Sequence, residues 1–363
     1  MDKLLEARAE IDAVDREMAA LFCRRMDAVR AVAVYKMEHG MPVLDAAREE
    51  QVVQKNLALL GEKRALYGAY YEDLLRREMA LSRTMQRRML GADTVAYQGV
   101  EGAFSHIALK RLFPHSAAKS LPTWADVFDE VSRGDAAYGV LPFENSSAGD
   151  VSEVLDLCFA HSELYVWDVY DLPVRQNLLG VAGARLSDVR TVLSHQQALW
   201  QCAPFLKRLG AATAAVANTA AAAKQVAEKG DASVAAIASR ETAQLYGLSV
   251  LAEDVNESAA NTTRFIVIAK QRRAAGDRFS LLFTVDHRAG ALARIMRIIG
   301  EEGFNLESIK SRPMPGRQWE YYFYAEVVGD VSEQGARALL EQLEAACRTV
   351  RVLGVYRRGS CEG

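Results

Sequence analysis

The N-terminal segment of the chain is long, amphipathic and free of helix breakers. Residues 4–38 contain no proline or glycine, and their apolar side chains recur at helical spacing. This pattern predicts one unusually long helix, which residues 39–42 bring to an end. Two shorter helices are predicted at 46–60 and 64–89, with a break near Gly61.

Three helices of such unequal length cannot bury the whole apolar stripe of the first one within a single chain. A second copy of the chain, exchanging helices or completing a bundle, would cover that stripe. The sequence therefore predicts a homodimer or a higher homo-oligomer.

The pattern changes after residue 91. Short β-rich runs alternate with amphipathic helical stretches over residues 92–271, which is typical of an α/β domain on a mainly parallel sheet. After a polar linker, residues 277–357 read as strand, helix, two strands, helix and strand, the order of a ferredoxin-like α+β unit. A chain of 363 residues, half of them apolar, can bury three such cores. We therefore predict three domains, with an all-α domain at residues 1–91.

The amino-acid composition limits the kinds of molecule that the chain is expected to bind. The 44 basic and 47 acidic residues leave a formal net charge of −3, so no global field attracts nucleic acid or an anionic membrane. No stretch approaches the roughly 18 apolar residues of a membrane span. The five cysteines form no Cys-x-x-Cys pair, and the six histidines show no metal-ligand spacing. We expect a cytoplasmic protein without a metal, whose anionic ligands are held by locally placed Arg and Lys.

Polar residues of the helical segment share faces. Arg25 and Lys36 are eleven residues apart, which at about 100° per residue puts them on nearly the same face. Arg8 falls on another face and would serve another site, most naturally that of a partner subunit. Ser82 and Gln86, four residues apart, share a face of the third helix. Taken singly, such side chains are usually just solvated.

The combination resembles the active-site set of the all-helical chorismate mutases, over about residues 4–89. The matching residues are Arg8, Arg25, Lys36, Asp45, Arg48, Glu49, Ser82 and Gln86. Asp45 can also cap the second helix. The resemblance implies the pericyclic rearrangement of chorismate to prephenate, which needs no nucleophile or cofactor. Catalysis then comes from orientation and electrostatics.

The resemblance also implies a role for each residue. Arg8 from one subunit and Arg25 from the other clamp the two substrate carboxylates. Lys36 and Gln86 donate to the ether oxygen as its bond breaks. Glu49 binds the ring hydroxyl, and the other three residues support these contacts.

Polar residues also gather where predicted strands of the middle segment end. The clusters lie at 142–149, 194–197, 218–219 and 261–265, and a glycine-containing loop at 99–105 is a weak sign of an anion site. Ligands of open α/β sheets bind at the carboxyl ends of strands, so these loops are expected to converge. Each cluster alone is more often a turn or a helix cap.

From about residue 95 to 270 the chain is similar to the prephenate dehydratases, whose Thr-Arg-Phe signature stands here at 263–265. This similarity implies two α/β subdomains around a cleft, as in periplasmic binding proteins. It makes Thr263 the general acid toward the departing hydroxyl and Arg264 the group that holds or orients the anionic substrate. A Thr hydroxyl is a poor acid by itself, and its activating neighbour is not evident. The substrate-binding residues are expected to be Glu144, Asn145, Ser146, Ser194, Gln201, Thr219 and Phe265.

Residues 278–356 resemble the ACT regulatory domains appended to prephenate dehydratases, which bind phenylalanine. The expected effector-binding residues are Gly290, Ala291, Leu292, Ser311 and Arg312. Gly290 alone could equally be a helix-start residue needed for its backbone. The usual Glu-Ser-Arg-Pro motif begins here with Lys310, which reverses a charge and leaves open whether phenylalanine control is weakened.

Together these resemblances imply a bifunctional enzyme of L-phenylalanine biosynthesis, converting chorismate to prephenate and prephenate to phenylpyruvate, with phenylalanine as effector. Two alternatives stay open, a dehydratase that prefers arogenate and a non-catalytic amino-acid-responsive binding protein. Because the two sites lie on separate domains, prephenate is expected to pass through solvent.

Overall fold

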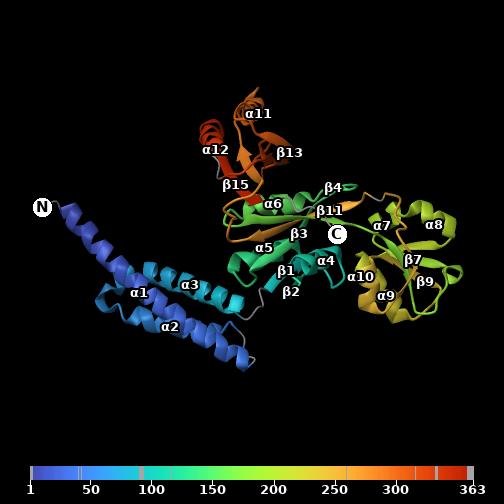
Figure 1. Cartoon of the computed structure of the whole chain (residues 1–363), viewed down its shortest axis with the longest axis horizontal. Coiled ribbons are helices and arrows are strands. Elements are labelled where there is room, and N and C mark those ends of the chain that lie inside the picture. Colours follow the sequence, from blue (N-terminus) through green and yellow to red (C-terminus); the bar gives the residue numbers. More distant parts are fainter. Residues whose placement is uncertain are drawn as a thin grey trace. The chain divides into compact units, whose positions relative to one another are not determined.

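The computed structural model describes residues 3–39, 41, 43–89, 94–114, 116–258, 260–314, 316–331 and 334–357. These residues form two compact units. One unit holds the N-terminal helices, and the other holds most of the chain beyond Thr94 (Figure 1). Among the described residues, no helix is both long enough and apolar enough to cross a membrane.

The N-terminal unit contains the three predicted helices, α1 (Lys3–Glu38), α2 (Ala46–Ala58) and α3 (Arg64–Met89), with a 3₁₀ turn at Gly61–Lys63. The predicted cap is confirmed, since the Asp45 side chain accepts a hydrogen bond from the backbone N–H of Arg48 at 2.9 Å. Of the predicted break at 39–42, residues 40 and 42 lie outside the described part, as do the boundary residues 90–93.

Helix α1 is poorly covered. Its N-terminal end projects beyond α2 and α3 (Figure 1), and Ala33 is its one buried residue among those described. Large apolar side chains of the predicted stripe stay more than 40% exposed, namely Leu4, Ile11, Val14, Met18, Leu21, Phe22 and Val32. A single chain therefore leaves the α1 stripe open, and its coverage by a second copy stays a prediction.

The middle domain has two lobes, as predicted. The first lobe holds β1 (Thr94–Gln98), β2 (Ala117–Leu121), β3 (Tyr138–Asn145), β4 (Gly149–Asp150), β5 (Tyr165–Pro173) and β11 (Thr262–Ala269), with helices α4 (Phe104–Leu112), α5 (Trp124–Arg133) and α6 (Ser152–Ala160). The second lobe holds β6 (Asn177–Gly180), β7 (Thr191–Ser194), β8 (Ala212–Ala215), β9 (Val234–Ala238) and β10 (Ser249–Ala252), with a 3₁₀ turn at Leu186–Asp188 and helices α7 (Gln196–Gln201), α8 (Ala203–Leu209), α9 (Thr219–Lys229) and α10 (Arg240–Tyr246).

Both lobe sheets are mixed, which corrects the expectation of a mainly parallel sheet. Strand β11 pairs antiparallel with both β3 and β5, and β6 pairs antiparallel with both β10 and β9. The cause is the double crossing between lobes, because the chain leaves the first lobe after β5 and re-enters it at β11.

The C-terminal domain follows the predicted βαββαβ order. Its elements are β12 (Arg278–Thr284), α11 (Ala291–Glu301), β13 (Asn305–Pro313), β14 (Tyr321–Val328), α12 (Gln334–Ala346) and β15 (Thr349–Tyr356). Residues 332 and 333, at the predicted start of the last helix, are not described.

The C-terminal sheet packs on both faces. One face is covered by α11 and α12, through Ile295, Ile299 and Leu339. The other face carries Tyr322 and Tyr324 into a core shared with the first lobe. Strand β15 also pairs parallel with β5, where Gly354 lies opposite Val166. The two domains therefore share one hydrophobic core.

Candidate active sites

The helical unit joins several predicted residues through α3. Nη1 of Arg25, on α1, donates to Oγ of Ser82 at 2.6 Å. Gln86 lies one turn further on α3 and is buried, with its Oε1 atom unpartnered among the described residues. A buried polar atom without a partner indicates a place for a ligand or water. Arg25, Ser82 and Gln86 therefore form one polar site.

Glu49 is held beside α3 by a residue that the sequence analysis missed. Nη1 of Arg83, next to Ser82 on α3, donates to both carboxylate oxygens of Glu49, at 2.7 and 2.5 Å. The Arg83 side chain is 14% exposed. The sequence does contain a signal for Arg83, because it lies three residues before Gln86 and so shares the side of the helix that carries Gln86.

The remaining residues of the helical set have other surroundings. Nζ of Lys36 donates to the carbonyl of Val43 at 2.6 Å, and Arg48 is exposed. Arg8 is exposed as well. The seventeen residues between Arg8 and Arg25 correspond to about 25 Å of helix, so Arg8 cannot reach the site that Arg25 lines in the same chain.

The middle domain holds a pocket of about 470 Å³ that both lobes line. All four predicted polar clusters contribute to it, and so does the loop at 99–105. The predicted catalytic and substrate-binding residues that line it are Asn145, Gln201, Thr219, Thr263 and Phe265. Other polar lining residues, Ser105, His195, Gln197, Asn218 and Asn261, belong to the predicted clusters and the 99–105 loop but were not singled out as binding residues. Gln98, Asp150 and Gln176 also line the pocket and lie outside every predicted cluster.

A hydrogen-bond chain crosses this pocket and ends at Thr263. Nδ2 of Asn145 donates to Oγ1 of Thr263 and to Oδ1 of Asn261, each at 2.9 Å. Nδ2 of Asn261 donates in turn to Oε1 of Gln201 at 3.1 Å. Because Oγ1 of Thr263 accepts from Asn145, its own hydrogen stays available for donation into the pocket.

Arg and Lys are both missing from the described lining of the pocket, which corrects the expectation that such side chains hold anionic ligands there. Three helices instead begin at the pocket wall, α4 after Ala103, α7 after His195 and α9 after Asn218. Helix α4 has no side-chain cap. Free N–H groups and the helix dipole favour anions at such ends, so the backbone can take the role expected of cations.

Three residues expected to bind substrate lie off the pocket. Ser194 is fully buried and donates to the carbonyl of Ile237 at 2.7 Å. Oγ of Ser146 accepts from the Thr262 N–H and so ties two loops together. Glu144 pairs with Lys310. These side chains are engaged within the protein, and their expected contact with substrate stays a prediction.

Arg264 also lies off the pocket, on the other face of β11 from Thr263 and Phe265. Its Nε and Nη2 atoms donate to the two carboxylate oxygens of Asp171, at 2.9 and 3.2 Å, and Nη1 lies 3.5 Å from Glu326 of β14. The Asp171 hydrogen bonds raise the pKa of the guanidinium. Successive residues of a strand point to opposite faces, so Arg264 lies away from the pocket that Thr263 lines. Its expected role in holding or orienting the substrate stays a prediction.

The expected effector residues divide between two surroundings. Gly290 precedes α11 with φ of 80°, and an added Cβ would meet nothing within 4 Å, so its backbone conformation requires glycine there. Ala291 and Leu292 open α11, and Ser311 is exposed. Arg312 instead donates to both carboxylate oxygens of Asp156, on α6 of the first lobe, at 3.0 and 2.6 Å.

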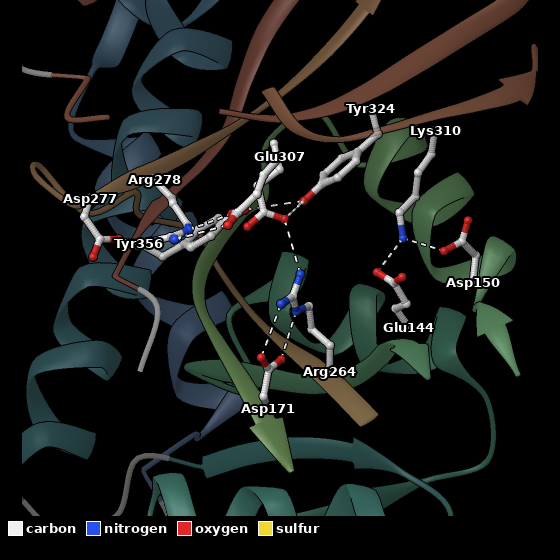
Figure 2. Close-up of polar contacts among 11 residues, drawn as sticks. Glu144, Asp150, Asp171, Arg264, Asp277, Arg278, Glu307, Lys310, Tyr324 and Tyr356 are labelled. Atoms are coloured by element: carbon white, nitrogen blue, oxygen red, sulfur yellow. Dashed lines mark hydrogen bonds and ion pairs between the residues drawn. The ribbon is translucent and has the colours of Figure 1, made fainter. Parts of the chain in front are cut away.

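Lys310 faces the first lobe in the same way. Its Nζ atom donates to Glu144 at 2.8 Å and to Asp150 at 2.5 Å, and Figure 2 shows it between the two carboxylates.

Within the described part of the chain, no cluster of His, Cys, Asp and Glu is suited to hold a metal ion.

Comparison with known families matches the three domains in order. The models match chorismate mutase type II over residues 7–87, prephenate dehydratase over 95–273 and the ACT domain over 279–345. This combination defines a mutase-dehydratase fusion with a regulatory domain.

Relatives of the same layout match nearly the whole chain. The bifunctional chorismate mutase/prephenate dehydratase of Neisseria gonorrhoeae is 33% identical over 97% of this chain and 96% of its own. That of Aquifex aeolicus is 31% identical over 98% of both. A prephenate dehydratase from Arthrobacter aurescens, solved in complex with L-Phe, matches 74% of this chain and 91% of its own with a TM-score of 0.67 and 27% identity. The chain belongs to the bifunctional chorismate mutase/prephenate dehydratase family.

Proposed function

We propose that this chain catalyses two successive steps of phenylalanine biosynthesis, chorismate to prephenate and prephenate to phenylpyruvate, under feedback inhibition by phenylalanine. The mutase would occupy residues 1–91, the dehydratase 92–271 and the regulatory domain 277–357. The observation that carries the proposal is the hydrogen bond from Asn145 to Thr263 in a two-lobed pocket, within a chain that matches bifunctional relatives end to end.

In the mutase step, the ether C–O bond of chorismate breaks as a new C–C bond forms, and negative charge develops on the ether oxygen. Gln86 and Lys36 are the donors assigned to that oxygen. Lys36 gives one hydrogen bond to Val43 and keeps two further N–H groups. Arg25 would bind one carboxylate, and Arg8 of a second copy the other, which fits the exposed α1 stripe.

In the dehydratase step, the ring C–OH bond and the bond to the ring carboxylate both break. Water and carbon dioxide leave, and the electrons of the broken C–C bond make the ring aromatic. Thr263 donates its proton to the departing hydroxyl. The Asn145 amide donates to Oγ1 of Thr263 and so stabilises the charge that develops there. This assigns to Asn145 the activation of the Thr263 hydroxyl.

The substrate carboxylates would lie at the N-termini of α4, which has no side-chain cap, and α9, whose Asn218 cap accepts from the Ala221 N–H; both helices begin at the pocket wall. Arg264 then acts as a positioning residue beside Thr263. Regulation would use the C-terminal domain with phenylalanine as the effector, and the enzyme would work in the cytoplasm as a homodimer or larger homo-oligomer.

A coupled assay on the purified full chain tests the proposal. Chorismate loss and phenylpyruvate formation are followed with and without phenylalanine, in the wild type and in Lys36→Ala and Thr263→Ala variants. With prephenate supplied directly for the second step, each variant should lose one step and keep the other. Arogenate is offered in a parallel dehydratase assay. A wild type that turns over none of the substrates chorismate, prephenate and arogenate would overturn the proposal.

A further inference from the structure

The dehydratase pair Asn145 and Thr263 sits beside a second cross-strand pair that reaches the regulatory domain. Strands β3 and β11 place Asn145 opposite Thr263 and the next residues, Glu144 and Arg264, opposite each other. Asn145 and Thr263 line the pocket. Glu144 binds Lys310, and Arg264 pairs with Glu326. The residues adjacent in sequence to Asn145 and Thr263, Glu144 and Arg264, are therefore both bound by the C-terminal domain.

Lys310 also holds the far end of the Asn145 turn. Glu144 and Asp150 face each other across the β3–β4 hairpin, whose turn begins at Asn145. Nζ of Lys310 bonds to both carboxylates, and Figure 2 shows Lys310 reaching across from the C-terminal domain to bind the two together. Asp150 lines the pocket itself. The one ammonium group thus fixes both strands of the hairpin that carries Asn145.

The charge at position 310 decides whether this arrangement can form. The Lys310 side chain is only 9% exposed, and its Nζ lies 4.9 Å from the centre of the Phe143 ring. A buried ammonium is stable when carboxylates compensate it. A carboxylate at this position would instead meet Glu144 and Asp150, and three like charges would repel one another. The Glu144 and Asp150 pair therefore requires a basic residue at position 310.

We propose that Lys310 is a positioning residue of the dehydratase, through which the regulatory domain sets the geometry of Asn145 and Thr263. An effector that shifts β13 would release the hairpin and misplace the donor to Thr263. This inference rests on the proposed dehydratase function. It means that the positive charge of Lys310 serves to bind carboxylates of the dehydratase domain, and not to bind the effector.

The test compares Lys310→Gln and Lys310→Arg with Asp156→Asn in the full chain. Asp156→Asn is the matched control, because it weakens another contact of β13 with the first lobe, the one made by Arg312 two residues further on. Lys310→Gln should lower the dehydratase kcat about tenfold, because a small displacement of a catalytic group has an effect of this order or larger. The KM for prephenate should change less than kcat. Lys310→Arg should keep most of kcat, and Asp156→Asn nearly all of it.

Internal controls accompany the comparison. Mutase activity of each variant should equal that of the wild type, which checks the N-terminal unit and the amount of enzyme. A urea unfolding curve for each variant checks that the dehydratase and C-terminal domains are folded. Lys310→Gln combined with Glu144→Gln should be no worse than Lys310→Gln alone, since Lys310→Gln has already removed the cation that Glu144 binds. Phenylalanine should inhibit Lys310→Gln less than the wild type, because the link it acts on is already broken.

The outcomes separate this inference from the proposed function. If the wild type has dehydratase activity and Lys310→Gln retains it fully, Lys310 has no positioning role. If Lys310→Gln and Asp156→Asn lose kcat equally, the ion pairs merely attach one domain to the other, and the inference fails as well. A wild type without dehydratase activity would overturn the proposed function itself.

Discussion

Both carboxylate oxygens of Glu49 accept a hydrogen bond from Nη1 of Arg83, which ties helix α2 to helix α3. In the proposed mutase site, Arg83 would therefore do two things. It orients the Glu49 carboxylate, and it offsets that negative charge in a site that must receive a dianionic substrate.

Replacement of Arg83 by Met should lower mutase kcat/KM by about tenfold or more, because it leaves a partly buried carboxylate without a partner. Dehydratase activity should be unaffected. Arg77→Met is the matched control, since Arg77 lies on the same helix and pairs with Asp73 in solvent. Equal mutase activity in Arg83→Met and the wild type would show that Glu49 needs no such support.

Much of the fold was predictable because its signals are local. The length of α1 follows from the absence of helix breakers, and the Asp45 cap follows from residue type and position. The order of strands and helices in the C-terminal domain follows from periodicity. The opposite directions of Thr263 and Arg264 also have a local cause, because side chains alternate between the two faces along any strand.

The contacts between elements had no local signal. Lys310 meets Glu144 across 166 positions of sequence, and this contact depends on how the C-terminal sheet packs against the first lobe. The Arg83 to Glu49 contact depends likewise on the relative rotation of two helices. Resemblance indicated the residue types of the site, but the partner of each side chain depends on the tertiary structure.

Asn145 donates to Thr263, so the dehydratase should depend strongly on its amide. Asn145→Asp replaces the donor with an acceptor and should lower dehydratase kcat by about 10²-fold or more, a loss typical of removing one donor to a developing oxyanion. Mutase activity, measured on the same preparation, should not change. A dehydratase kcat within twofold of the wild type would remove Asn145 from the mechanism.

Gly354 allows β15 to approach β5 closely. A Cβ added there would lie 2.4 Å from the carbonyl oxygen of Val166, so Gly354→Ala must push the strands apart. We expect a loss of about 1–3 kcal/mol in the free energy of unfolding, measured in urea. Gly300→Ala is the control, because Gly300 is helical and an added Cβ meets nothing within 4 Å. That variant should be as stable as the wild type or slightly more so.

The ion pair of Asp156 with Arg312 predicts a pH dependence of stability. The Arg312 hydrogen bonds hold the pKa of the Asp156 carboxyl below its ordinary value, against the opposite effect of burial. The unfolded pKa is about 3.9, so the carboxylate stabilises the folded chain above about pH 4, and this contribution is lost as the pH falls through the lower folded-state pKa. Asp156→Asn should therefore cost about 1 kcal/mol or less at pH 7, since solvent screens the pair. In urea unfolding, the difference from the wild type should shrink as the pH falls below 4. A difference that stays constant from pH 7 to pH 3 would mean that the charge of Asp156 does not contribute.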